Sequence, residues 1–259
     1  MDSLGDRMKS YYENAYRIYL TRRTPTIIRI DGKAFHTFTR RLAKPYDKIF
    51  KRTMWNTTKY LCENIQNTRL GYVQSDEISI LMIDYNKFTT AAWFDNNIQK
   101  ICSVSASMAT MAFNKFFKEE VEKYFNAEGV NDHYGVTLET YMKKFGNAMF
   151  DSRVFNLPES EVCNYFIWRQ QDATRNSIEL LGREYFSQKE LYKINCKQIQ
   201  DKLLTEKGIN WNDCPTFFKR GVCVDKIDDT DNPWLLDLEI PIFTQDRNYI
   251  EKHLEVEDK

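Results

Sequence analysis

Two aspartates in the first third of the chain lie at the ends of predicted strands. Asp31 comes directly after the β-branched run Thr26–Ile30, and Asp76 lies in a polar turn just before the run Ile78–Ile83. Hard cations such as Mg²⁺ prefer oxygen ligands and usually take one or two protein carboxylates together with substrate phosphates. Two such ions stabilise both the attacking and the leaving oxygen of a displacement at phosphorus. If the fold brings the two aspartates together, they form a candidate site for phosphoryl transfer.

Basic residues crowd behind the first of these acids. The segment after Gly32 contains His36, Arg40, Arg41 and Lys44. Cationic side chains neutralise phosphate charge, and successive N–H groups in the turn at 31–36 can bind an anion. Each signal is weak alone, because an Asp-Gly pair usually marks a turn and paired arginines usually face solvent. The site therefore depends on where the fold places these residues.

The elements that must position these residues are predicted from hydrophobic periodicity. The first part of the chain is expected to form strands at Thr26–Ile30, Tyr72–Val73, Ile78–Ile83 and Phe150–Leu157, and helices at Tyr46–Gln66 and Met108–Phe125. The order strand–helix–strand–strand–helix–strand is typical of a ferredoxin-like antiparallel sheet. In that sheet, the end of the first strand and the hairpin before the third lie at one edge. Asp31 should therefore meet Asp76 and Glu77.

The remainder of the chain is predicted to be largely helical. The expected elements are a polar helical start at Asp6–Tyr19, a helix after Pro158, a helix from about Gln188 to Gly208, and a strand at Phe217–Val224. We therefore expect an α+β protein with packed helices. Its catalytic core should span 1–157, and a C-terminal helical and hairpin region at 158–259 should pack on that core.

A second polar cluster lies on the helix expected after Pro158. Its members are Trp168, Arg169, Gln170, Asp172, Arg175 and Asn176. From the residues alone, the favoured interpretation is a helix with an exposed polar face and a buried Trp168.

The composition limits the kinds of surface that the protein can present. Thirty-seven basic and 37 acidic residues balance to a formal net charge of zero, so a nucleic-acid surface must be a local patch. The six cysteines include no C-x-x-C pair, which favours reduced thiols over a zinc site or a disulfide framework. The charged start, MDSLGDRMKS, does not resemble a signal peptide, and no apolar run is long enough to span a bilayer. We expect a cytoplasmic protein without membrane contact.

Several ordered motifs resemble the tRNA-His guanylyltransferase family and its Thg-like relatives. These are the runs RIDGKAFHTF, AKPYD, GYVQSDEISI, FDSRVFNLP, NYFIWRQQDATRNS and GINWNDCPTFFKRG, which together lie between Asp6 and Val224. The resemblance implies a sheet like the palm of ordinary polymerases and a largely helical C-terminal part. It also implies two Mg²⁺ ions, tRNA and nucleoside triphosphates as partners, and a homotetramer.

The resemblance also implies roles for individual residues. The catalytic residues would be Asp31, Asp76 and Glu77, and the metal ligands would be Asp31, Asp76 and the Gly32 carbonyl. The nucleotide would be bound by Arg29, Asp31, Gly32, Lys33, Ala34, Phe35, His36, Lys44, Ser75 and Asp76. Contacts to tRNA, or a role in activation, would come from Arg169, Gln170, Asp172 and Asn176.

The family adds nucleotides in the 3′-to-5′ direction. ATP or GTP first activates a 5′-monophosphate on the tRNA, and the 3′-hydroxyl of an incoming nucleotide then attacks the activated end. Eukaryotic members carry a histidine-isoleucine-asparagine-asparagine-leucine-tyrosine-asparagine motif, whereas this chain has Thr174–Leu180, in which only Asn176 clearly matches. That departure resembles the bacterial, archaeal and phage branch, which repairs truncated tRNA 5′ ends on a template. The alternative is addition of a single G to tRNA-His.

Two more distant functions are weighed against this one. A palm-fold nucleotide cyclase shares paired acids on the same sheet edge, but its turn normally carries two glycines where this chain has Gln74 and Ser75. A non-enzymatic RRM-like RNA-binding module stacks bases on exposed aromatic side chains of its central strands. The run Ile78–Ile83 offers no aromatic residue.

Overall fold

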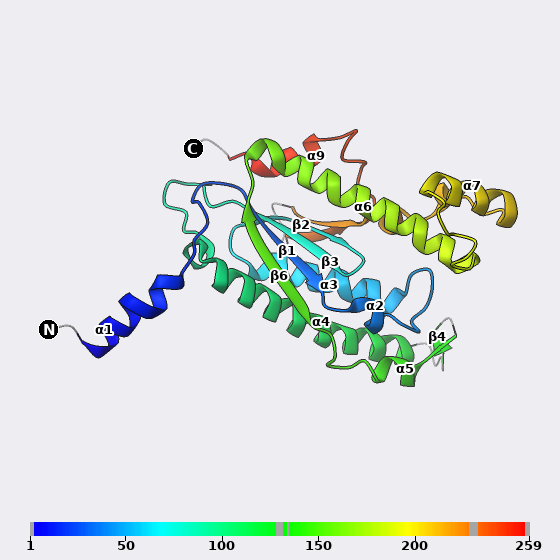
Figure 1. Cartoon of the computed structure of the whole chain (residues 1–259), viewed down its shortest axis with the longest axis horizontal. Helices are drawn as coiled ribbons and strands as arrows, with labels where there is room; N and C mark the ends of the chain where they lie inside the picture. The colour runs from blue at the N-terminus through cyan, green and yellow to red at the C-terminus, as the bar shows by residue number, and fades with distance from the viewer. Residues whose placement is uncertain (1–2, 128–131, 134, 228–232, 257–259) are drawn as a thin grey trace.

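The computed structural model describes residues 3–127, 132–133, 135–227 and 233–256. Within these ranges, six strands form one antiparallel sheet in the order β6-β1-β3-β2-β7-β8 (Figure 1). The strands are β1 Thr26–Gly32, β2 Thr68–Gln74, β3 Glu77–Met82, β6 Phe150–Asn156, β7 Val222–Lys226 and β8 Trp234–Asp237. The first four in this order are the predicted ferredoxin-like arrangement, which is confirmed.

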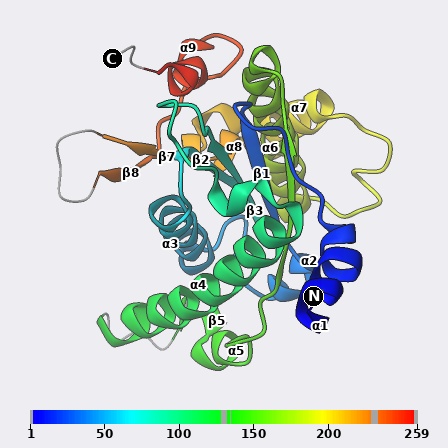
Figure 2. The same ribbon diagram turned by 90° about the vertical axis from the view of Figure 1, so that its left-hand side faces the viewer.

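Helices cover both faces of the sheet. Helices α3 (Lys48–Asn64) and α4 (Ile98–Ala127) lie on one face, and α6 (Glu159–Tyr185) lies on the other (Figure 2). The shorter helices include α2 Phe35–Phe38, α5 Leu138–Met142, α7 Cys196–Lys207, α8 Thr216–Arg220 and α9 Asn248–Glu251. A two-stranded sheet pairs β4 (Asp132–His133) with β5 (Val136–Thr137).

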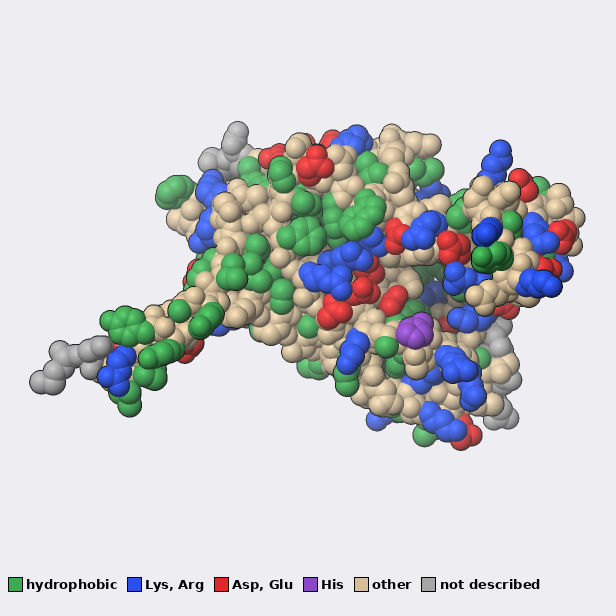
Figure 3. All heavy atoms as spheres, in the orientation of Figure 1, with side chains coloured by type: hydrophobic (Ala, Val, Ile, Leu, Met, Phe, Trp, Pro, Cys, Tyr) green, Lys and Arg blue, Asp and Glu red, His purple; other side chains and the backbone are tan. Residues whose placement is uncertain are grey.

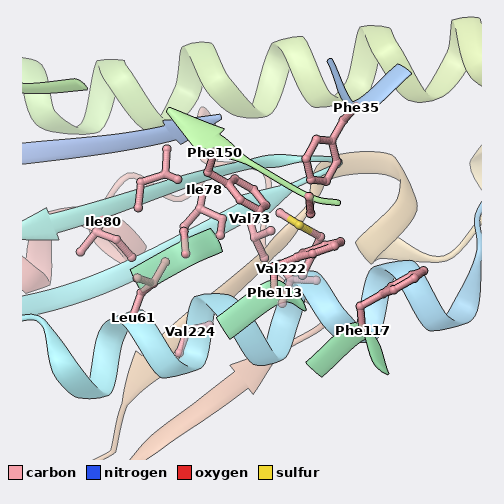
Figure 4. Close-up of a cluster of buried hydrophobic side chains, with 14 of the residues drawn as sticks. Phe35, Leu61, Val73, Ile78, Ile80, Phe113, Phe117, Phe150, Val222 and Val224 are labelled. Carbon is pink, nitrogen blue, oxygen red and sulfur yellow. The ribbon is translucent and has the colours of Figure 1, made fainter. Parts of the chain in front are cut away.

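The alternation of side chains along the strands explains the two cores. Ile28 and Ile30 of β1 belong to a large apolar cluster with residues of α3 and α4, among them Leu61 and Phe113. Figure 4 shows part of this cluster, with Leu61 and Phe113 labelled. Ile27 points to the other face and packs with Phe166 of α6. Because side chains alternate along a strand, Arg29 and Asp31 share the α6 face with Ile27.

Several predicted elements differ from the observed ones. The predicted helix Gln188–Gly208 begins only at Cys196, because Asn195 and Gln198 form a capping box there. The predicted strand Phe217–Val224 is divided between the short helix α8 and β7, since Pro215 suits a helix start. The predicted helix Met108–Phe125 is the C-terminal part of the longer α4.

The chain start and the C-terminal region also contribute to the architecture. The predicted helical start is a short α1 (Leu4–Met8) followed by a π-helical turn (Lys9–Glu13) and a 3₁₀ turn (Asn14–Tyr16), which project from the body (Figure 1). After residue 158, the chain supplies both α6 and the strands β7 and β8, so the later region completes the same sheet. In the described residues, every helix is too short or too polar to cross a membrane.

Candidate active site

The two aspartates lie at one edge of the sheet. Asp31, the penultimate residue of β1, pairs in register with Glu77, and the Gly32 amide donates a hydrogen bond of 3.1 Å to the carbonyl of Asp76. Burial raises the pKa of the partly buried Asp76 to about 6, and the nearby charge of Asp31 adds to that rise. Two neighbouring carboxylates disfavour each other's ionised form, and a bound cation relieves that repulsion.

The donor set at this edge fits a hard cation bound together with a substrate. Among the described residues, no group of three or more His, Cys, Asp and Glu side chains is placed to hold a metal ion. Asp31 and Asp76 supply two carboxylates, and the Gly32 carbonyl is a third oxygen at the same edge. Since Mg²⁺ commonly takes one or two carboxylates and completes its shell with water and phosphate, two aspartates are sufficient.

The turn after Asp31 offers fewer free amides than its sequence indicates. The Gly32 amide bonds Asp76, and the Lys33 amide donates to the Met149 carbonyl at 2.9 Å. Ala34 has a positive φ of 56° and opens α2, so residues 34–36 hold the amides at the start of that helix. The part of the turn left for an anion is therefore its second half, from Ala34 to His36.

Gly32 has a packing role that the sequence analysis did not include. A Cβ at this position would lie 2.3 Å from Cδ2 of Phe35, so any side chain there clashes with the ring. Phe35 is itself buried against Phe113 and Phe150. Close approach of an aromatic ring thus requires glycine here, whether or not a phosphate also approaches.

A pocket of about 220 Å³ opens beside Ser75, the residue that precedes Asp76. Its polar edge includes Lys44 and Asn176, and its interior is largely aromatic and aliphatic. The residues that line it include Lys44, Tyr46, Lys51, Trp55, Ser75, Asn176 and Phe217. An apolar pocket with a few polar groups at its rim suits the planar base and ribose of a nucleoside.

Lys51 is held among the aromatic rings of this pocket. Its Nζ lies 3.8 Å from the centroid of the Phe217 ring and 5.1 and 5.2 Å from those of Tyr46 and Trp55. Burial lowers the pKa of Lys51 to about 8, with the neighbouring charge of Arg52 contributing. The pocket was missed in the sequence because α3 and α8 are far apart in the chain and neither carries a local motif for it.

Glu77 connects the sheet edge to α6. Its Oε1 accepts from Arg169 Nε at 2.6 Å, and its Oε2 accepts from Arg169 Nη2 at 3.0 Å and from Arg29 Nη2 at 2.5 Å. Both Glu77 and Arg169 are almost fully buried. With its oxygens engaged by two arginines, Glu77 is placed to hold the hairpin, and Arg29 faces this carboxylate.

The other polar residues of α6 divide into two groups. Gln170 is buried and clamps the C-terminal segment by bonding the Pro241 carbonyl and the Phe243 amide, each at 2.9 Å. Arg169 and Gln170 are thus buried and serve the packing of α6, and the role in tRNA contact or activation that the resemblance implied for them stays a prediction. Asp172 lies between Arg169 and Arg175, whereas Asn176 reaches the nucleoside-sized pocket.

Arg153 of β6 also lies at the site, although no role was predicted for it. Its Nη2 lies 4.0 Å from Asp31 Oδ2 and 3.1 Å from Asp151 Oδ1, and its side chain is half exposed. Asp151 and Arg153 alternate along the predicted strand Phe150–Leu157, and this pattern would have predicted that both lie on one face of the sheet. Figure 3 shows acidic and basic side chains interleaved on this face of the molecule.

Comparison with known proteins identifies the family of this chain. The family model described as tRNAHis guanylyltransferase (Thg1) matches residues 5–158, which include both aspartates. The chain belongs to this family. It is therefore a nucleotidyltransferase of the Thg1 type, as the motifs predicted, and membership decides against the cyclase and the RNA-binding module.

Solved structures of Thg1-like proteins are similar over nearly the whole chain. A bacterial tRNA(His) guanylyltransferase (Thg1)-like protein in complex with ATP is 48% identical with a TM-score of 0.85, covering 98% of this chain and 100% of the other. A structure of such a protein in complex with GTP is 45% identical with a TM-score of 0.79 and the same coverage. Among curated proteins, uncharacterized protein R259 of Acanthamoeba polyphaga mimivirus is 29% identical over 87% of this chain and 77% of its own length.

Proposed function

We propose that this chain extends the 5′ end of truncated tRNA in the 3′-to-5′ direction, copying the opposite strand of the acceptor stem. The observation that carries the proposal is the meeting of Asp31 and Asp76 beside a nucleoside-sized pocket. Thg1-like proteins in complex with ATP and with GTP support both nucleotides as ligands here.

The proposed chemistry consists of two displacements at phosphorus. An oxygen of the RNA 5′-phosphate attacks the α-phosphorus of ATP or GTP, and pyrophosphate leaves. The 3′-hydroxyl of the incoming nucleotide then attacks the activated 5′-phosphorus, and AMP or GMP leaves. If the RNA end already carries a triphosphate, the same attack releases pyrophosphate.

The residues at this edge of the sheet have different roles in the two displacements. The pocket beside Ser75 seats the nucleoside, while Lys44 and the start of α2 offset phosphate charge. Asp31, Asp76 and the Gly32 carbonyl would hold Mg²⁺, which stabilises the negative charge that develops at phosphorus. Glu77 keeps the hairpin that carries Asp76 against α6.

The segment of α6 at the position of the eukaryotic motif supports repair over addition of a single G. Thr174 replaces the histidine, and Arg175 is ion-paired with Asp172 and Glu179 on the helix surface. Asn176, the matching residue, lines the nucleoside-sized pocket. We also propose the homotetramer that the family resemblance implies and the cytoplasmic location that the sequence predicts.

The test is nucleotide addition to a series of tRNA transcripts with 5′ ends truncated at different positions, carrying a 5′-monophosphate or triphosphate. Template-directed repair predicts extension that follows the opposite strand and stops when the stem is complete. Addition of one G to full-length tRNA-His alone would favour the alternative function. A folded protein that extends none of these RNAs would contradict the proposal.

A further inference from the structure

Trp168 is an exposed aromatic side chain with a fixed position. Its side chain lies on α6, and 51% of the residue is exposed. The guanidinium carbons of Arg169 and Arg29 lie 4.3 and 5.5 Å from the centroid of the indole, and Tyr165 meets it edge-on at 5.9 Å. These contacts hold the ring while about half of the residue remains open to solvent. The expectation of a buried Trp168 was wrong.

The indole lies close to the carboxylate edge. Arg29, which it covers, is two residues before Asp31 on the same face of β1, a spacing of about 7 Å along a strand. Arg153 pairs in register with Arg29 and reaches to 4.0 Å from Asp31. The exposed indole, the half-exposed Arg153 and Asp31 therefore lie close together on the same side of the sheet.

This surface is separate from the pocket assigned to the nucleoside. That pocket opens beside Ser75 and uses residues of α6 from Ala173 onward, whereas Trp168 lies outside its lining. Trp168 and Ala173 are five positions apart on the α-helix, a rise of about 7.5 Å along its axis. The two aspartates thus have a place for a nucleoside on the hairpin side and an aromatic platform on the Arg29 side.

We propose that Trp168 is the stacking platform for the 5′-terminal base of the RNA substrate, with Arg153 beside that nucleotide's phosphate. The inference rests on the proposed function and deepens it by assigning a residue to the RNA end. One nucleotide bridges the surface, with its base on the indole and its 5′-phosphate at Asp31. Stacking on an aromatic ring accepts any base, which suits an enzyme whose template chooses the sequence.

A purely structural role for Trp168 makes a different prediction. The indole also packs against Arg169 and Arg29, the two arginines that hydrogen-bond the buried Glu77. Trp168→Leu keeps an apolar cover but removes the aromatic face, whereas Trp168→Phe keeps a smaller aromatic face. Tyr185→Leu is the matched control, because Tyr185 is another exposed aromatic residue on α6, near its C-terminal end, with 42% exposure.

The experiment uses the full chain and truncated tRNA with 2-aminopurine as its 5′-terminal base, whose fluorescence falls on stacking. We expect quenching with the wild type, Trp168→Phe and Tyr185→Leu, and loss of quenching with Trp168→Leu. In nucleotide addition, Trp168→Leu should raise KM for the RNA roughly tenfold, as expected for a lost base stack, and leave KM for the nucleotide unchanged.

Two results would contradict the proposal that Trp168 stacks on the 5′-terminal base. One is quenching by Trp168→Leu equal to that of the wild type. The other is a lower Tm and kcat in Trp168→Leu with an unchanged KM for the RNA, which is the signature of a structural cover. Failure of the proposed function is distinct, since the wild type would then extend no tRNA even if it quenched the probe.

Discussion

The amide of Gly32 donates a 3.1 Å hydrogen bond to the carbonyl of Asp76, and this contact joins the end of β1 to the turn before β3. It brings together two acids that are separated in the sequence by the helices α2 and α3 and the strand β2. Because the backbone makes the contact, the position of Asp76 relative to Asp31 depends on the register of the sheet and not on either side chain. Changes to the carboxylates should therefore leave the fold in place.

Asp76→Asn should abolish nucleotide addition and stabilise the folded protein. The folded-state pKa of Asp76 is raised to about 6, above the unfolded value near 3.8, so the ionised carboxylate costs stability. That cost is absent below pH 4 and grows until the pH passes about 6. In EDTA at pH 8, we expect a gain on the order of 1 kcal/mol and a higher Tm, with almost no gain at pH 3.5. A lower Tm at pH 8 would contradict this.

Gly32→Ala should destabilise the protein by overpacking. The new methyl group would lie 2.3 Å from Cδ2 of Phe35, and that ring is enclosed by other aromatic rings. We expect a loss of about 2 kcal/mol in the free energy of unfolding, measured with urea. Phe35→Leu in the same chain should relieve part of the clash, so that the double variant loses less than the sum of the single losses. Strict additivity would show that the two positions do not interact.

Lys51→Met should weaken nucleotide binding and leave the protein as stable or more stable at pH 7. Burial lowers the pKa of Lys51 to about 8, so its charged form is penalised in the folded state relative to the unfolded one. This penalty on the charged form is present at pH 7 and shrinks as the pH rises from the folded pKa toward the unfolded pKa. In the wild type, KM for the nucleotide should rise severalfold between pH 7 and 9 as the cation is lost. In the variant, KM for the nucleotide should not change between pH 7 and 9. A rise in KM there would assign the pH dependence to a group other than Lys51.

Glu77→Gln should be strongly destabilising, because it leaves Arg169 buried with a weakened partner. Removing one partner of a buried ion pair typically costs about 3–5 kcal/mol, and the retained amide oxygen should place this change near the lower end. Glu179→Gln is the control, since its pairs with Arg175 and Arg183 lie on the helix surface and should contribute less than about 1 kcal/mol. Urea denaturation compares the two, and equal losses would contradict the positioning role of Glu77.

Local sequence patterns were sufficient to predict the sheet edge at which Asp31 and Asp76 meet. The β-branched run before Asp31, the amphipathic helix after it and the polar turn at Asp76 each predict one element, and their order allows one familiar sheet. The topology then determines which residues meet, because strand order and direction place the ends of β1 and β3 together. That is why two distant acids could be paired from the order of the elements alone.

The nucleoside-sized pocket and the aromatic platform were decided only by tertiary packing. Lys51 meets Phe217 because α8 packs against α3, and no periodicity within either segment records that contact. Trp168 is exposed because α6 turns Arg169 and Phe166 into the protein, and Arg29 lies beneath the indole. A hydrophobic pattern specifies which face of an element is buried, whereas the neighbours of that face depend on long-range contacts. The meeting of Asp31 and Asp76 therefore followed from the sequence, whereas the pocket and the exposed indole near them did not.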